Sequence, residues 1–104
     1  MNNLKTLQKR LDWEISRYTI DFKGLPMPVI KAILIPIKEK YMELGKNINA
    51  AYIQYIYDSI IYGKENTQAK IYMHKSKGIN DVMYYAIYDI INGIKAAKVA
   101  IQAA

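Results

Sequence analysis

The sequence predicts an all-α protein, because apolar residues recur with a helical period and glycine and proline separate the periodic segments. The longest periodic segment is the last one, residues 80–104. Its apolar residues follow one another at steps of three and four, which places them on one side of an α-helix. The residues on this side are Met83, Ile87, Ile90, Ile94, Ala97 and Ile101.

The same period near the N-terminus predicts a first helix over residues 3–22. Asn2 or Asn3 can cap the start of this helix, since asparagine side chains accept hydrogen bonds from the first free backbone N–H groups. The apolar positions again follow steps of three and four, which indicates an amphipathic helix packed on a core. These positions are Leu4, Leu7, Leu11, Ile15, Tyr18 and Phe22.

The middle of the chain is expected to form two further helices. The second helix, residues 28–44, begins at Pro28, which suits the first positions of a helix because it lacks an N–H group. The third helix, residues 48–62, follows Asn47 and Asn49, either of which can cap it. Glycine follows each of these two helices, as is typical of helix ends.

A short helix over residues 66–75 and a long one over residues 80–103 complete the fold. Asn80 or Asp81 is expected to cap the long helix. Short loops favour antiparallel packing of successive helices. We therefore predict a compact four-helix bundle with an additional short helix and antiparallel neighbours, in which residues 1–104 form a single helical-bundle domain.

Nineteen residues that begin at Lys46 match the nineteen that begin at Lys77 at eight positions. A duplicated helix explains this match, and so does chance in a chain that is rich in isoleucine, tyrosine and lysine.

The composition restricts the class of protein. The chain has no cysteine, which excludes disulfides and thiolate metal sites. Its longest apolar run is too short to span a membrane and the N-terminus does not resemble a signal peptide, so we expect a cytoplasmic protein. The abundance of Ile, Lys, Asn and Tyr is typical of A/T-rich genomes, including those of phages and archaeal viruses.

No motif in the sequence predicts catalysis. The single histidine, His74, lies in a lysine-rich segment, and none of the three serines is in a recognisable nucleophile motif. The acidic residues lack the spacing of metal ligands, and there is no glycine-rich phosphate loop. We therefore expect a non-enzymatic protein that has no catalytic residues, no metal and no cofactor.

The formal charge of +6 raises the odds of an anionic partner such as nucleic acid. Residues 64–78 hold four lysines and one glutamate, a net charge of +3. Salt-sensitive contacts to phosphates are the expected role of such residues. The candidate polyanion contacts are Lys64, Lys70, His74, Lys75 and Lys77, together with Lys9, Arg10 and Arg17 of the first helix.

Trp13 lies off the apolar stripe of the first helix, next to Lys9, Arg10 and Arg17. We interpret it as a packing anchor against a second helix, because a single tryptophan in a small chain usually fills a core. The alternative is an exposed aromatic ring among cations that stacks on a base.

Eight of the ten tyrosines lie between Tyr52 and Tyr88, too many for a small core. Exposed tyrosine is favoured at protein interfaces, and a stripe of small residues on the last helix permits close helix contacts. The alternative is that the rings cover the bundle with their hydroxyls in water. The candidate interface residues are Tyr52, Tyr55, Tyr62, Tyr84, Tyr85, Tyr88, Ala86, Gly93, Ala97 and Ala100.

These observations favour a small protein that acts by protein–protein contacts. Its partner is expected to be a second copy, which gives a homodimer, or another protein that it inhibits as an immunity-type binder does. The composition is in keeping with a phage or viral origin. The first alternative is a basic nucleic-acid-binding protein that uses residues 64–78 and the face formed by Lys9, Arg10 and Arg17. The second alternative is a self-assembling structural, coat-like subunit that associates through its last helix.

Overall fold

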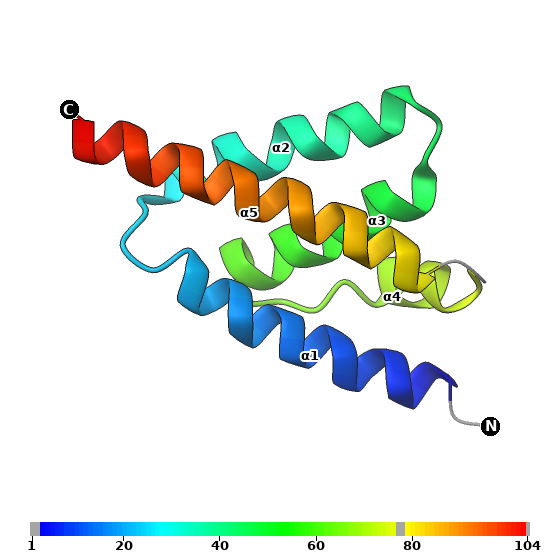
Figure 1. The fold of residues 1–104 in the computed structure, drawn as a ribbon. Helices are drawn as coiled ribbons and strands as arrows, with labels where there is room; N and C mark the ends of the chain where they lie inside the picture. Colours follow the sequence, from blue (N-terminus) through cyan, green and yellow to red (C-terminus); the bar gives the residue numbers. More distant parts are fainter. Residues whose placement is uncertain (1–2, 77–78, 104) are drawn as a thin grey trace.

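The structure, a computed structural model, describes residues 3–76 and 79–103 and confirms the all-α fold (Figure 1). It contains no strand among these residues. The helices agree with the expected ones to within one or two residues, except that the third changes from α to π geometry near its end. They are α1 (Asn3–Asp21), α2 (Met27–Glu43), α3 (Asn47–Tyr57), the π-helix η1 (Asp58–Tyr62), α4 (Thr67–His74) and α5 (Ile79–Ala103).

α3 is the central helix, because it packs against α2, α4 and α5. Figure 1 shows α2 running antiparallel to both α3 and α5, while α5 crosses the front of the bundle and ends beyond it. α1 lies on the other side and packs against α4 and η1. The longest dimension of the molecule is 50 Å, and the other two are 27 and 20 Å.

The core is built from the facing sides of these helices. Ile53 and Ile56 of α3 are completely buried, and so are Leu34 of α2 and Met83 and Ile90 of α5. Apolar surface removed from water contributes about 25 cal/mol per Å², so this cluster is the main source of stability. The predicted apolar side of the last helix is correct in its first half, whereas Ile101 near its end is largely exposed.

Glycine and proline end and begin the helices as expected. α2 starts one residue earlier than predicted, with Pro26 at its cap and Pro28 in its first turn. Gly45 and Gly63 follow α2 and η1 with positive φ angles of 72° and 63°. Other residues rarely adopt this conformation, because their Cβ atom clashes with the backbone. Lys64 N–H then bonds to the carbonyl of Asp58 and closes the turn after η1.

The predicted caps of α3 and α5 are wrong. α3 begins after Lys46 without a side-chain cap, while Asn47 is in the helix and Asn49 is buried. α5 begins at Ile79, so Asp81 lies inside its first turn, and the Asn80 side chain lies outside the described residues. The proposed cap Asn2 also lies outside the described residues, and Asn3 is the first residue of α1. The one capping bond of this kind that the structure gives is on α4, where Ala69 N–H donates to Asn66 Oδ1 at 2.9 Å.

Glu14 lies on the buried side of α1, which the sequence pattern did not predict. The described residues that α1 buries are Leu7, Leu11, Glu14 and Tyr18, Phe22 is buried just after the helix ends, and the expected member Ile15 is only half-buried. Positions 7, 11, 14 and 18 also follow steps of four and three, so the helical period is the predicted one. A carboxyl group therefore replaces an apolar side chain in the middle of the stripe.

Candidate functional site

Three neighbouring tyrosines of α5 place their rings in solvent. Ala86 and Ile90 of the same helix are completely buried, so positions 84, 85 and 88 lie on the opposite side. Tyr84, Tyr85 and Tyr88 are 66%, 63% and 64% exposed. The rings of Tyr84 and Tyr85 contact each other edge to face, with centroids 5.8 Å apart. We call this surface, formed by Tyr84, Tyr85 and Tyr88, the tyrosine face.

A groove with a volume of about 410 Å³ adjoins the tyrosine face. The turn before α3 and the first turn of α3, residues 45–49, form one wall, and the first two turns of α5 with Asp81 and Tyr85 form another. Tyr72 of α4 also lines the groove and is largely exposed. Aromatic rings from two helices therefore flank a hollow that a side chain of a partner can enter.

Tyr52 and Tyr55, predicted as interface residues, belong to the core instead. Tyr52 is completely buried on α3, and its hydroxyl lies 3.3 Å from the hydroxyl of Tyr18. Tyr55 is 2% exposed, and its hydroxyl donates to Glu65 Oε1 at 2.8 Å. Each ring fills apolar space while its hydroxyl has a polar partner, buried Tyr18 for Tyr52 and exposed Glu65 for Tyr55, which makes burial of tyrosine favourable. Burial raises the pKa of both phenols.

The small residues of α5 serve packing inside one molecule, which corrects their assignment to an external interface. Ala86 is completely buried. A Cβ atom on Gly93 would lie only 2.8 Å from Cγ2 of Ile33, so the absence of a side chain lets α5 approach α2. Ala97 is half-buried against the core, and only Ala100 is exposed as an external interface requires.

Tyr62 is exposed as predicted but lies on a different element. It is the last residue of η1 and is 66% exposed. Its ring contacts Tyr57 at 5.9 Å between centroids. Tyr62 matches the tyrosines of α5 in residue type and exposure, which makes it a suitable control for experiments on the tyrosine face.

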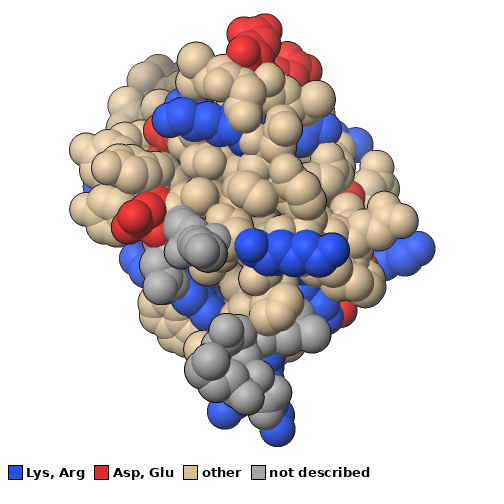
Figure 2. Space-filling model, turned by 90° about the vertical axis from the view of Figure 1, so that its right-hand side faces the viewer, with Lys and Arg blue, Asp and Glu red and all other residues tan. Residues whose placement is uncertain are grey.

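On the face that Figure 2 draws, the Lys and Arg side chains of the described residues are dispersed among uncharged surface and a few acidic groups. Lys64 and Lys75 are exposed, whereas His74 is half-buried. Lys70 is paired with Glu65, Nζ to Oε2, at 3.1 Å, which offsets its charge. Lys77 lies outside the described residues.

The expectation that Trp13 anchors a helix contact is wrong, because its side chain is 58% exposed. The guanidinium carbon of Arg17 lies 5.5 Å from the centroid of the indole ring, a cation–π contact at the surface. Lys9 is exposed one turn before Trp13 on the same side of α1, and Arg10 next to it is half-buried and engaged with other groups. The structure therefore matches the alternative, an aromatic ring among cations.

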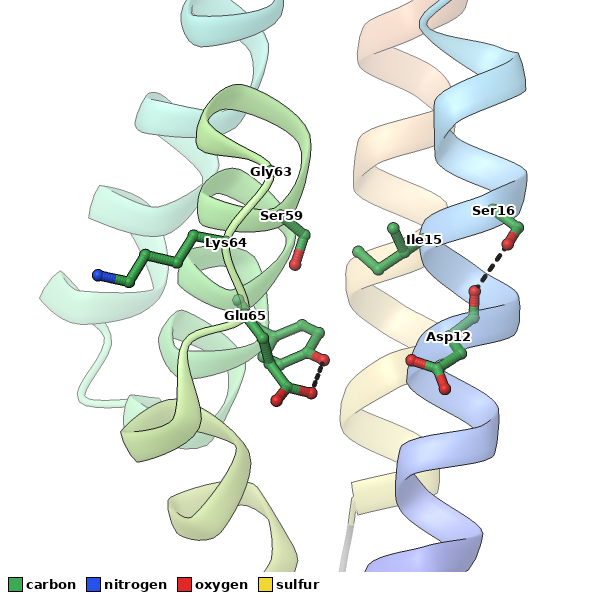
Figure 3. Close-up of a pocket in the computed structure, with 8 residues that line it drawn as sticks. Asp12, Ile15, Ser16, Ser59, Gly63, Lys64 and Glu65 are labelled. Carbon is green, nitrogen blue, oxygen red and sulfur yellow. Dashed lines mark hydrogen bonds between the residues drawn. The ribbon is translucent and has the colours of Figure 1, made fainter.

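A cavity of about 340 Å³ separates α1 from the segment that follows η1 (Figure 3). Asp12 and Ile15 point from α1 towards this segment, and Ser59 and Glu65 point back towards α1. Ser16 donates to the backbone carbonyl of Asp12 at 3.0 Å and is thereby turned away. The hydrogen bond that the Tyr55 hydroxyl donates to Glu65 lowers the pKa of this carboxyl, and nearby Lys70 acts in the same direction.

The walls of the cavity combine polar and apolar groups. Asp12, Ser59, Lys64 and Glu65 supply the polar groups, and Ile15 and Tyr55 supply apolar surface. Among residues 3–76 and 79–103, no group of three or more His, Asp or Glu side chains is arranged to hold a metal ion. In the same part of the chain, every helix is too short or too polar to cross a membrane.

Glu14 is a charged residue buried in the core, where its side chain is only 2% exposed. Its Oε2 atom has no hydrogen-bond partner. Desolvation raises the pKa of Glu14 above the ordinary 4.5, although Arg10 and Arg17 on the same helix partly oppose this rise. Burial is the main influence that raises the pKa of Tyr18 and Tyr52, and the Glu14 carboxylate acts in the same direction.

Comparison of the chain with protein-family models, with curated proteins and with solved structures finds no significant match.

Proposed function

We propose that this protein acts by binding another protein through the tyrosine face, without catalytic activity. The observation that supports the proposal most strongly is the exposure of Tyr84, Tyr85 and Tyr88 side by side on one helix. Large aromatic side chains in water are costly unless a partner covers them, and tyrosine offers large contact area with few rotatable bonds. The groove beside Tyr85 adds a concave element to this surface.

Site-specific photo-crosslinking tests this proposal. A benzophenone amino acid replaces Tyr85 in one variant and Tyr62 in a matched control, since the two tyrosines are equally exposed on different elements. After irradiation in the native host cells, we expect a protein adduct of discrete mass from position 85 only. The adduct should disappear when Tyr84 and Tyr88 are replaced by serine. Equal labelling from both positions, or no adduct from position 85, would contradict the proposal.

The second candidate function is binding of nucleic acid along α1, which the contact of Arg17 with the exposed Trp13 favours. Stacking of a base on an aromatic ring beside cations is typical of single-strand binding. The chain contains one tryptophan, so its fluorescence reports directly on this surface. Quenching by an oligonucleotide that falls steeply with salt would support this second function over the first.

A further inference from the structure

Charges of opposite sign lie at the two ends of the tyrosine face. α5 carries four charged residues, Asp81, Asp89, Lys95 and Lys98. Asp89 is engaged within the molecule, where it accepts a bond from Lys40 Nζ at 2.9 Å. Asp81 and Lys95 are exposed and lie fourteen residues apart, close to four helical turns, so both fall on the side of the tyrosines.

The midpoint between Asp81 and Lys95 is Tyr88. If two α5 helices pair antiparallel about a twofold axis at Tyr88, each Asp81 lies opposite Lys95 of the other copy. The two Tyr88 rings then meet at the axis, where offset stacking is favourable. The exposed amide of Asn92 lies opposite the Tyr84–Tyr85 pair. A parallel pair would instead place like charges together, which is unfavourable.

We propose that two copies of this chain associate through their tyrosine faces, with antiparallel α5 helices and with Asp81 of each copy paired to Lys95 of the other. This inference names the partner for the proposed function and rests on it. The contact extends over about 21 Å of helix between the two charges. It includes two ion pairs and six tyrosine rings in the dimer.

Charge complementarity favours a second copy as the occupant of this surface. The whole chain carries a formal charge of +6, yet Asp81 and Lys95 give the paired surface no net charge. Repulsion between two copies therefore comes from more distant groups. At physiological salt the Debye length is about 8 Å, which screens most of that repulsion while the paired side chains remain in contact.

A charge swap tests the proposed register. Sedimentation equilibrium at physiological salt is expected to give a monomer–dimer equilibrium for the wild-type chain. Asp81→Lys and Lys95→Asp should each weaken dimerisation by about tenfold or more, because each replaces two attractive pairs with two repulsive ones. The double variant should recover the wild-type dissociation constant to within about threefold, since it restores both pairs in reversed order.

Lys98→Asp is the matched control, because Lys98 is exposed on the same helix but lies to the side of the tyrosine face. It should leave the dissociation constant within about threefold of wild type. Circular dichroism should show equal helix content in all variants. The inference would be overturned by any of three results: a double variant that does not recover the wild-type dissociation constant, a wild-type chain that stays monomeric, or a mass that grows beyond the dimer. A monomeric chain that still gives an adduct with a different protein from position 85 would refute self-association alone, whereas the absence of any adduct would refute the proposed function.

Discussion

Replacement of Gly93 by valine is expected to lower the free energy of unfolding by about 2–3 kcal/mol. A Cβ atom at this position would lie 2.8 Å from Cγ2 of Ile33, closer than carbon atoms approach without displacement. Ile33 is buried and branched at Cβ, so the methyl group cannot rotate away freely. α5 must therefore move away from α2, with loss of packing along the contact. Urea unfolding followed by circular dichroism measures the change.

A matched substitution and a double variant make this prediction specific. Ala96→Val is made at an exposed position of the same helix and should change the free energy of unfolding by less than about 0.5 kcal/mol. Ile33→Ala removes the methyl group that a side chain at position 93 would meet. Gly93→Ala should therefore cost less in the Ile33→Ala background than in wild type, with a coupling of about 0.5–1 kcal/mol or more. Additive effects would refute close contact between the two helices at this point.

Replacement of Glu14 by glutamine is expected to raise the free energy of unfolding at pH 8 by about 1–2 kcal/mol. Glu14 is buried in the apolar stripe of α1, and one of its carboxylate oxygens has no partner. The amide has nearly the same shape but carries no charge, so it avoids the cost of burying an ionised group. The attraction that Arg10 and Arg17 exert on the carboxylate reduces this gain without cancelling it, because desolvation is the largest influence on the pKa.

The effect of this substitution should depend on pH in a defined direction. The pKa of Glu14 is raised in the folded protein above the ordinary value of 4.5, so the folded state binds more protons than the unfolded state above this pH. Ionisation of Glu14 should therefore lower the free energy of unfolding of the wild-type chain as pH rises above about 4.5. The Glu14→Gln variant should not show this decrease. The difference between the two proteins should be small at pH 4 and largest at pH 8.

Glu39→Gln provides the control, since Glu39 is exposed on α2 and its substitution should have little effect at either pH. A Glu14→Gln variant that is less stable than wild type at pH 8 would contradict the account. Such a result would mean that the attraction of Arg10 and Arg17 for the carboxylate exceeds its desolvation cost.

The helices could be predicted from the sequence because their signals are local. Apolar period, proline and glycine depend on residues three or four positions apart, and these signals give four of the five α-helices to within about two residues. The third helix was expected to reach residue 62, whereas α3 ends at Tyr57 and η1 continues to Tyr62. The caps at Asn47 and Asn49 were wrong because asparagine can also sit inside a helix, where Asn49 is buried by tertiary packing. The π geometry of η1 has no comparable sequence signal.

The candidate site was only partly predictable, because exposure depends on which helices meet. The number of tyrosines indicated that some lie outside the core, and Tyr84, Tyr85 and Tyr88 are indeed exposed, but the sequence did not show which tyrosines these are. Tyr52 and Tyr55 were misassigned because their burial depends on distant partners, Tyr18 in α1 and Glu65 after η1. Glu14 follows the helical period of the buried stripe of α1, but a charged residue is not expected to be buried. Its burial becomes evident only from the packing of α1 in the structure.

The distance between two spin labels tests most directly whether α5 helices pair antiparallel through the tyrosine face. The chain has no cysteine, so Lys98→Cys gives one labelling site, beside the proposed contact. Position 98 lies ten residues from Tyr88, so an antiparallel dimer centred there separates the two labels by about 30 Å along the helix axis. A distribution of distances near this value, lost in Asp81→Lys, is the predicted result. A separation near the interhelical distance of about 10 Å, or no dipolar coupling at concentrations where the wild-type chain is dimeric, would contradict it.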